Sequence, residues 1–269
     1  MVFAALVFGD PKVEHALWRT IAAFVAFCAV SSAGYIFNDW VDIDRDRIHP
    51  GKKKRPLAAG EITVRTAIIT AIVLLIFATL ISLIVNPVLT AVLAAYAVLM
   101  GAYSLKLKTI VLLDVFVIAI GFLLRAVAGA AAVEVPVSAW LMLCTLLLAL
   151  FLAFGKRRSE LVRLGDKASE HRPVLAGYSV SLLDQFLVIT ATCSIMAYSI
   201  YSFSAESVPG NGVMMLTVPP VMFAVFRYLL LVLKRNEGGA PEMLLWRDTP
   251  LLASVILWSV SVLGVIYFA

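Results

Sequence analysis

The sequence has 269 residues, of which 62% are hydrophobic and 14% are charged, and its formal net charge is +5. Soluble domains carry charge on roughly a quarter of their residues, so this composition excludes an ordinary soluble protein. Apolar runs close to the ~20 residues that a bilayer-spanning helix needs recur along the chain, whereas a membrane β-barrel would show short alternating segments. The sequence therefore predicts an all-α polytopic membrane protein.

Eight full transmembrane helices and one partial helix are expected. Met1 to Phe8 has the composition of the end of a span, and the full spans are predicted over residues 16–38, 63–85, 88–104, 110–132, 138–155, 183–204, 212–233 and 250–268. No soluble segment separates these spans, so residues 1–269 are predicted to form a single transmembrane domain. For the same reason nucleic acid is not expected as a partner, because there is no soluble basic domain to bind it.

The basic residues are distributed unevenly between the loops. Nineteen of the 22 Lys and Arg residues lie in four segments, 39–65, 105–109, 156–172 and 227–247, and the alternate loops around Asn86-Pro87, Glu134 and Ser204–Asn211 carry none. All four basic segments therefore fall on one side of the membrane, which the positive-inside rule assigns to the cytoplasm.

A group of carboxylates lies at the end of the first full span. Asn38, Asp39, Asp42 and Asp46 form the pattern N-D-x-x-D-x-x-x-D. If the helix continues through them, the three aspartates lie within roughly 60° of one another on one helix face. Carboxylates so placed repel one another without a cation, and Mg²⁺ prefers oxygen ligands. The pattern predicts a Mg²⁺ site made by Asp39, Asp42 and Asp46, with Asn38 available to a phosphate or a bound water.

A solvated helix end is the competing interpretation of this segment. Asp44 points away from the other aspartates, and the adjacent Arg45 and Arg47 can form ordinary ion pairs with carboxylates. The basic run that follows favours the metal site. Lys52 to Arg55 lie in a loop interrupted by glycine and proline. Such a loop can close over a polyphosphate and neutralise the oxygens that a metal ion does not reach.

Ionisable residues also occur at the next cytoplasmic turn and in the span that follows it. Tyr103, Lys106 and Lys108 lie at the turn, while Asp114 and Arg125 are separated by about three helical turns. An ionisable residue inside a span is a functional candidate by default. A structural pair, with Asp114 on Lys106 or Arg125 on a backbone carbonyl, is an equally good interpretation.

A second basic group, at the end of the predicted span 138–155, reads GKRRSE. Lys156 and Arg157 are three to four residues from Glu160, a spacing that permits salt bridges on a helix. The group either anchors the helix end or binds a phosphate, and the residues alone leave both interpretations open.

The chain resembles the UbiA-type intramembrane prenyltransferase superfamily. The N-D-x-x-D-x-x-x-D pattern, the number of spans and the chain length carry the resemblance. It implies a nine-helix bundle around a central cavity, with the active site at the cytosolic end, and a diphosphate held through Mg²⁺ on aspartates. The family also implies a basic cytosolic segment and a full first helix, whereas this sequence begins at MVFAALVFGDP, midway through that helix.

The sequence departs from the usual family pattern at one segment, and with this departure it resembles one branch of the family, the decaprenyl-phosphate phosphoribosyltransferases. Basic GKRRSE stands where most members carry a second aspartate-rich motif, and DRDRIHPGKKKRPLAAG also carries the likeness. This branch implies phosphoribosyl diphosphate as donor, polyprenyl (decaprenyl) phosphate as acceptor and Mg²⁺ as cofactor, in a bacterial-type inner membrane. We expect the catalytic and metal-binding residues to be Asp39, Asp42 and Asp46, and the substrate-binding residues to be Asn38, Lys52, Arg55, Tyr103, Lys106, Asp114, Arg125, Lys156, Arg157 and Glu160.

Two other functions compete with phosphoribosyl transfer. The first is ordinary transfer of an isoprenyl group from its diphosphate to an aromatic or lipid acceptor, against which the basic GKRRSE segment argues. The second is a transporter, which would need ionisable residues near the midplane of several spans, whereas the charges here gather at one end. The sequence leaves open whether copies of the chain associate into a homo-oligomer.

Overall fold

The computed structural model describes residues 1–8, 14–48, 51–165, 168, 172–204 and 212–268 of the chain. These residues form α-helices, short 3₁₀ turns and connections, with no strand in the ranges just given, which confirms the all-α prediction. The chain divides into two compact units, Met1–Val137 and Ser138–Ala269, called unit 1 and unit 2 below.

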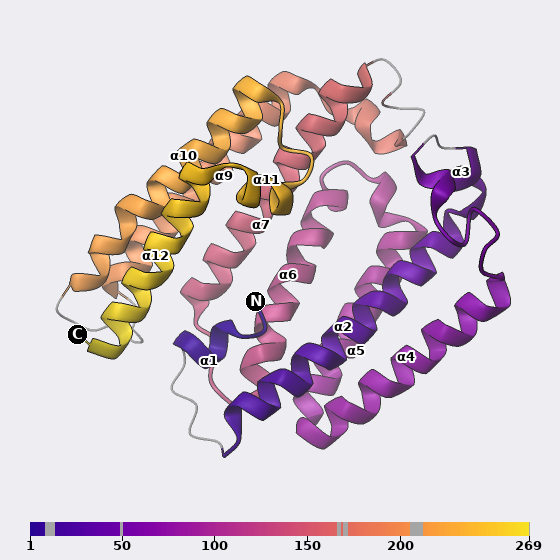
Figure 1. Ribbon diagram of the computed structural model, residues 1–269, viewed down its shortest axis with the longest axis horizontal. Helices are drawn as coiled ribbons and strands as arrows, with labels where there is room; N and C mark the ends of the chain where they lie inside the picture. The colour runs from indigo at the N-terminus through magenta and orange to yellow at the C-terminus, as the bar shows by residue number, and fades with distance from the viewer. Residues whose placement is uncertain (9–13, 49–50, 166–167, 169–171, 205–211, 269) are drawn as a thin grey trace. The chain divides into compact units, whose positions relative to one another are not determined.

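Unit 1 consists mainly of long helices that run antiparallel to their neighbours (Figure 1). Its helices are α1 (Ala4–Phe8), α2 (Ala16–Val41), α3 (Ile43–Ile48), α4 (Val64–Val85), α5 (Pro87–Leu105) and α6 (Leu113–Ala132), and its 3₁₀ turns are η1 (Lys52–Lys54) and η2 (Leu107–Thr109). The helices α2 and α4 pack along each other, and α5 packs against both α2 and α6.

Unit 2 also consists mainly of long helices. Its elements are α7 (Ala139–Leu164), η4 (Pro173–Gly177), α9 (Val180–Ser204), η5 (Val213–Thr217), α10 (Val218–Arg235), α11 (Pro241–Arg247) and α12 (Thr249–Phe268). Asp248 begins α12: its carboxylate accepts a hydrogen bond from the backbone N–H of Leu251 at 2.9 Å. Two hydrogen bonds from Arg227 hold the pKa of Asp248 below its usual range.

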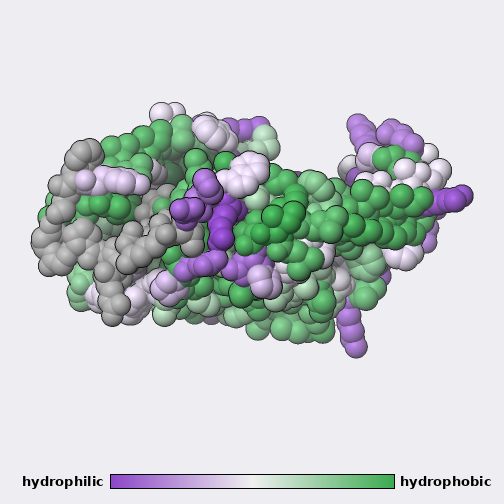
Figure 2. All heavy atoms as spheres, turned by 90° about the horizontal axis from the view of Figure 1, so that it is seen from below, coloured by the Kyte–Doolittle hydropathy of each residue, from purple (hydrophilic) through white to green (hydrophobic). Residues whose placement is uncertain are grey.

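Among the described residues, eight helices are long and apolar enough to cross a membrane, and they coincide with the eight predicted spans. Their outer surfaces are apolar, as an integral membrane protein requires. Ile84 is 85% exposed, Val98 73% and Leu216 73%. Figure 2 shows hydrophobic side chains over most of one face, with hydrophilic side chains gathered in a few groups. Ala4–Phe8 forms the short helix α1, and its identity as the end of a ninth span stays a prediction.

Several helices begin or end three or more residues from the predicted span limits: α6 begins at Leu113 where residue 110 was expected, and α9 begins at Val180 where residue 183 was expected. The span expected to end at residue 38 continues to Val41, and the span expected to end at residue 155 continues to Leu164. The α7 extension carries Lys, Arg and Glu residues, which form helix well but lower the hydropathy of a window, whereas the α2 extension is only Asp39, Trp40 and Val41. Beyond residue 155, the extension places the whole KRRSE segment on a helix.

The helices of unit 1 approach one another closely where small residues allow it. A Cβ atom at Gly129 would lie 1.9 Å from the carbonyl oxygen of Val2, so the segment before α1 packs on α6 only because this position is glycine. At Gly121 a Cβ atom would meet Met100 and Tyr96 of α5 at 3.4 Å. Both glycines therefore serve helix packing.

Candidate functional site

The aspartates lie where α2 gives way to α3. Asp42 stands at the C-cap of α2, yet its N–H still donates to the Asn38 carbonyl at 3.0 Å and its own carbonyl accepts from the Asp46 N–H at 2.8 Å. The interruption is therefore a single residue, and helical spacing is retained from Asp39 to Asp46. The assumption behind the sequence pattern, a helix continuing through the aspartates, holds approximately.

Arg55 joins two of the aspartates. Its Nη1 donates to Asp39 Oδ1 at 2.6 Å and to Asp46 Oδ2 at 2.8 Å. Lys52 adds a longer ion pair to Asp46 at 3.7 Å. The side chain of Asp46 is only 3% exposed, so its charge needs this compensation, because an unpaired buried charge is strongly unfavourable. The loop around η1 thus folds back onto the carboxylates, and its closure over a polyphosphate stays a prediction.

Lys108 holds the third aspartate. Its Nζ lies 2.7 Å from both carboxylate oxygens of Asp42 and 3.2 Å from Asn38 Oδ1. The side chain of Lys108 is 13% exposed and that of Asp42 is 15% exposed. Lys108 belongs to η2, so the turn between α5 and α6 lies against the end of α2 within unit 1.

The three carboxylates do not converge on one point in this arrangement. Within the described ranges, no group of three or more His, Cys, Asp or Glu side chains lies close enough to hold a metal ion. Cationic nitrogens take the places beside the carboxylates instead, and Arg55 Nη1 stands directly between Asp39 and Asp46. Carboxylate and amide oxygens that already attract a shared cation fit Mg²⁺ chemically. The metal assignment of Asp39, Asp42 and Asp46 stays a prediction.

The interpretation as a solvated helix end describes only the outer side of this segment. Asp44, with 89% of its side chain exposed, accepts a hydrogen bond from Arg47 at 3.3 Å. As expected, it points away from the other aspartates. The inner carboxylates are paired with basic residues from other turns and not with the neighbouring Arg45 or Arg47.

The structure separates the other predicted residues of unit 1. Lys106 is exposed, whereas Lys108, from the same turn and not selected from the sequence, contacts Asp42. Tyr103 lies in the last turn of α5, and Asp114 is fully buried in the first turn of α6. Arg125 is surrounded by aromatic rings and donates to Tyr96 Oη at 3.2 Å, and no backbone carbonyl of the described residues accepts from it. A salt bridge that depends on which face a short 3₁₀ turn presents leaves no periodic signal in the sequence.

In unit 2 the three consecutive basic residues have different environments. Lys156 is exposed, but Arg157 is 2% exposed and pairs with Glu160 at 3.0 Å. Arg158 is 6% exposed and donates to Asp184, to the Val232 carbonyl and to Asn236. The salt bridge that the spacing allowed is therefore present, and Lys156 is the residue of the three that presents its charge at the surface.

Replacing Lys108 with methionine is expected to lower the free energy of unfolding by about 1–3 kcal/mol. The change keeps an aliphatic side chain but leaves the mostly buried Asp42 carboxylate without its cation. Denaturant unfolding of the detergent-solubilised protein in EDTA measures the loss. Lys106→Met removes the same charge from the same turn and should leave stability unchanged. Equal stability of the two variants would contradict a structural role for the Lys108–Asp42 pair.

The chain is similar to a known protein family and to several known proteins. The family described as the UbiA prenyltransferase family matches residues 1–247. Decaprenyl-phosphate phosphoribosyltransferase from Mycolicibacterium smegmatis is 32% identical, with 93% of this chain and 81% of that protein covered. The protein of the same name from Mycobacterium tuberculosis strain H37Rv is 30% identical, with 94% and 83% covered. A UbiA homologue from Archaeoglobus fulgidus, solved with GPP and Mg²⁺, has a TM-score of 0.74 and 20% identity over 98% of this chain and 94% of that one.

Proposed function

Because this chain belongs to the UbiA prenyltransferase family and is a transferase, we propose that it moves a 5-phosphoribosyl group from phosphoribosyl diphosphate to a polyprenyl phosphate. The observation that carries the proposal is the set of three aspartates in contact with Arg55 and Lys108. A site with both charges in contact can take up a metal ion on its acids and phosphates on its bases. The name of these relatives supports the phosphoribosyl group as the one transferred and a polyprenyl phosphate as the acceptor.

The proposed reaction exchanges one phosphate ester at the anomeric carbon for another. A phosphate oxygen of the acceptor forms a bond to C1 of the ribose, the bond from C1 to the diphosphate oxygen breaks, and diphosphate leaves with the electron pair. The acceptor is already an anion and needs no general base. Positive charge develops at C1, as in glycosyl transfer generally. The protein must mainly position two anions and offset their repulsion.

Asp39, Asp42 and Asp46 would hold Mg²⁺, which supplies positive charge to the leaving diphosphate when bound. Arg55 and Lys108 would then be free of the carboxylates and would bind phosphate oxygens, Arg55 with two parallel N–H donors. Lys52 lies on the same loop and adds a further cation. Asn38 orients a phosphate or a water through its amide group.

The remaining predicted residues have narrower roles in the proposal. Tyr103 and Lys106 bind substrate polar groups at the turn between α5 and α6, and Asp114 positions that turn from the start of α6. In unit 2, Lys156 binds a substrate phosphate, while Arg157 and Glu160 support it through their salt bridge. The concentration of basic residues near these turns supports a cytoplasmic active site in a bacterial-type inner membrane.

Transfer of radiolabel tests the proposal. The purified protein in detergent is incubated with ribose-labelled phosphoribosyl diphosphate, a polyprenyl phosphate and Mg²⁺, and the lipid phase is counted. We expect label in the lipid phase, and none when EDTA is added. A protein that instead joins an isoprenyl diphosphate to an aromatic acid, and leaves the ribose label in water, would contradict the proposal and would be a prenyltransferase in the usual sense.

A further inference from the structure

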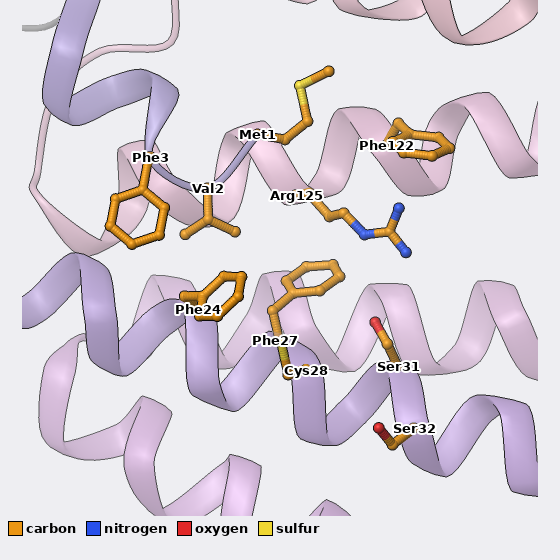
Figure 3. Close-up of a pocket in the computed structure, with 10 residues that line it drawn as sticks. All are labelled: Met1, Val2, Phe3, Phe24, Phe27, Cys28, Ser31, Ser32, Phe122 and Arg125. Atoms are coloured by element: carbon orange, nitrogen blue, oxygen red, sulfur yellow. The ribbon is translucent and has the colours of Figure 1, made fainter. Parts of the chain in front are cut away.

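Unit 1 contains a pocket of about 400 Å³ between α2, α6 and the segment that precedes α1 (Figure 3). Four of its ten lining residues are phenylalanines and one side chain is cationic, and the residues that matter here are Phe3, Phe24, Phe27, Ser31, Phe122 and Arg125. Ser31 precedes Asp39 by eight residues on α2, so the pocket lies about 12 Å along that helix from the aspartates. It is therefore a different place from the site described above.

Arg125 lies among aromatic rings inside a membrane-spanning helix. Its Cζ is 4.6 Å from the ring centre of Phe122, 5.6 Å from that of Phe27 and 5.7 Å from that of Tyr96. These distances are within the range of cation–π attraction, which partly offsets the cost of burying the charge. In Figure 3 the guanidinium extends between Phe122 and Phe27 toward the side of the pocket that carries Ser31.

The guanidinium has more donors than the described protein atoms use. Of its five N–H groups, one donates to Tyr96 Oη at 3.2 Å, an oxygen that also accepts from Ser31 Oγ at 3.2 Å. Aromatic rings attract a cation but accept no ordinary hydrogen bond in the guanidinium plane. Arg19, Arg55, Arg158 and Arg227 each pair with a carboxylate. Among the residues that the structure describes, no carboxylate pairs with Arg125.

We propose that this pocket binds the phosphate group of a lipid. The planar fork of Arg125 matches two phosphate oxygens, and the hydroxyl of Ser32, which also lines the pocket, offers a donor to a third. The phenylalanines provide an apolar surface for the hydrocarbon chain. Phe3 and Phe24 are 38% and 45% exposed, so the hydrocarbon of the lipid can leave the pocket on that side. An uncompensated cation beside an apolar surface is suited to an anion that carries its own hydrocarbon.

Binding in the absence of the reaction tests this proposal. The full chain in an uncharged detergent with EDTA is titrated with farnesyl phosphate, and the midpoint of thermal unfolding is followed, with farnesol as the uncharged control. We expect farnesyl phosphate to raise the midpoint and farnesol to leave it unchanged. Because EDTA prevents metal binding and no donor is present, the result does not depend on the proposed transferase activity.

Matched variants show whether farnesyl phosphate binds at Arg125. Arg125→Gln should weaken farnesyl phosphate binding by roughly tenfold or more, since it removes charged hydrogen bonds. Arg65→Gln removes an exposed cation from α4 and should bind as the wild type does. Asp39→Asn should also keep the shift. An Arg125→Gln protein that binds like the wild type, or an equal shift with farnesol, would overturn the proposal.

Two further arms complete the test. Ser31→Asp places a carboxylate beside Tyr96 and Arg125, and it should raise the midpoint without ligand while abolishing the farnesyl phosphate shift, even if Arg125→Gln fails to fold. Retention of the full shift in Ser31→Asp would count against the site. Dioleoyl phosphatidic acid distinguishes the source of the phosphate: a matching shift identifies lipid phosphates in general, and no shift identifies an isoprenoid phosphate.

Discussion

Asp39→Asn is expected to lower phosphoribosyl transfer by about 10²–10³-fold, the range found for loss of one preorganised electrostatic contact. Asparagine has the same shape but no negative charge, so the proposed Mg²⁺ would lose one of three carboxylates. Folding should survive, because the amide oxygen can still accept from Arg55 and Asp46 keeps its own pairing with Arg55. Initial rates over a Mg²⁺ titration measure the loss, and an unchanged unfolding midpoint shows that the protein is intact.

Asp44→Asn is the matched control for this change. It removes the same charge from the same segment, but the Asp44 side chain is 89% exposed and touches only Arg47 among the described contacts. Activity should stay close to that of the wild type. If both variants lost activity equally, net charge would explain the effect. If Asp39→Asn kept full activity at every Mg²⁺ concentration, Asp39 would not be a metal ligand.

The helices could be predicted from hydropathy because each span needs about 20 apolar residues whatever its neighbours are. The ends could not. In α7 the helix continues past residue 155 into Lys, Arg and Glu residues, which lower the local hydropathy although they form helix well, and in α2 it continues for three residues that include Asp39. Membrane thickness therefore set the predicted spans, whereas the observed ends at Val41 and Leu164 depend on local backbone hydrogen bonds.

In the candidate site, the carboxylates could be predicted from the sequence but their partners could not. The spacing of Asp39, Asp42 and Asp46 identified the carboxylates, because helical periodicity is a local property. Their partners are not local: Arg55 is 16 residues from Asp39, and Lys108 is 66 residues from Asp42. Lys106 and Lys108 are the same residue type in the same turn, and only the path of η2 brings Lys108 to Asp42. Pairing across turns is a tertiary property that no residue pattern in one sequence encodes.

Tertiary contacts also distinguish the consecutive basic residues on α7, and one of these residues gives the largest expected effect on stability. Arg158→Met should lower the free energy of unfolding by about 2–4 kcal/mol. Arg158 connects α7 to Asp184 of α9, to the Val232 carbonyl of α10 and to Asn236, which ends α10 in the left-handed conformation. Methionine fills much of the space but donates no hydrogen bond, so the Val232 carbonyl and the Asn236 amide lose a donor. Denaturant unfolding of the detergent-solubilised chain measures the change.

Lys156→Met separates the two interpretations of this run, helix anchor and phosphate site. Lys156 is exposed and precedes Arg158 by two residues, so its loss should leave the unfolding midpoint unchanged while raising the KM for phosphoribosyl diphosphate or for the polyprenyl phosphate. A loss of stability in Lys156→Met comparable to that in Arg158→Met would favour the anchor for both residues. A stable Arg158→Met protein would show that the contacts of Arg158 with α9 and α10 add little to folding. Because the two side chains are two residues apart within one turn of α7, on nearly opposite faces, and differ in burial, stability and substrate affinity should change independently, the first with Arg158 and the second with Lys156.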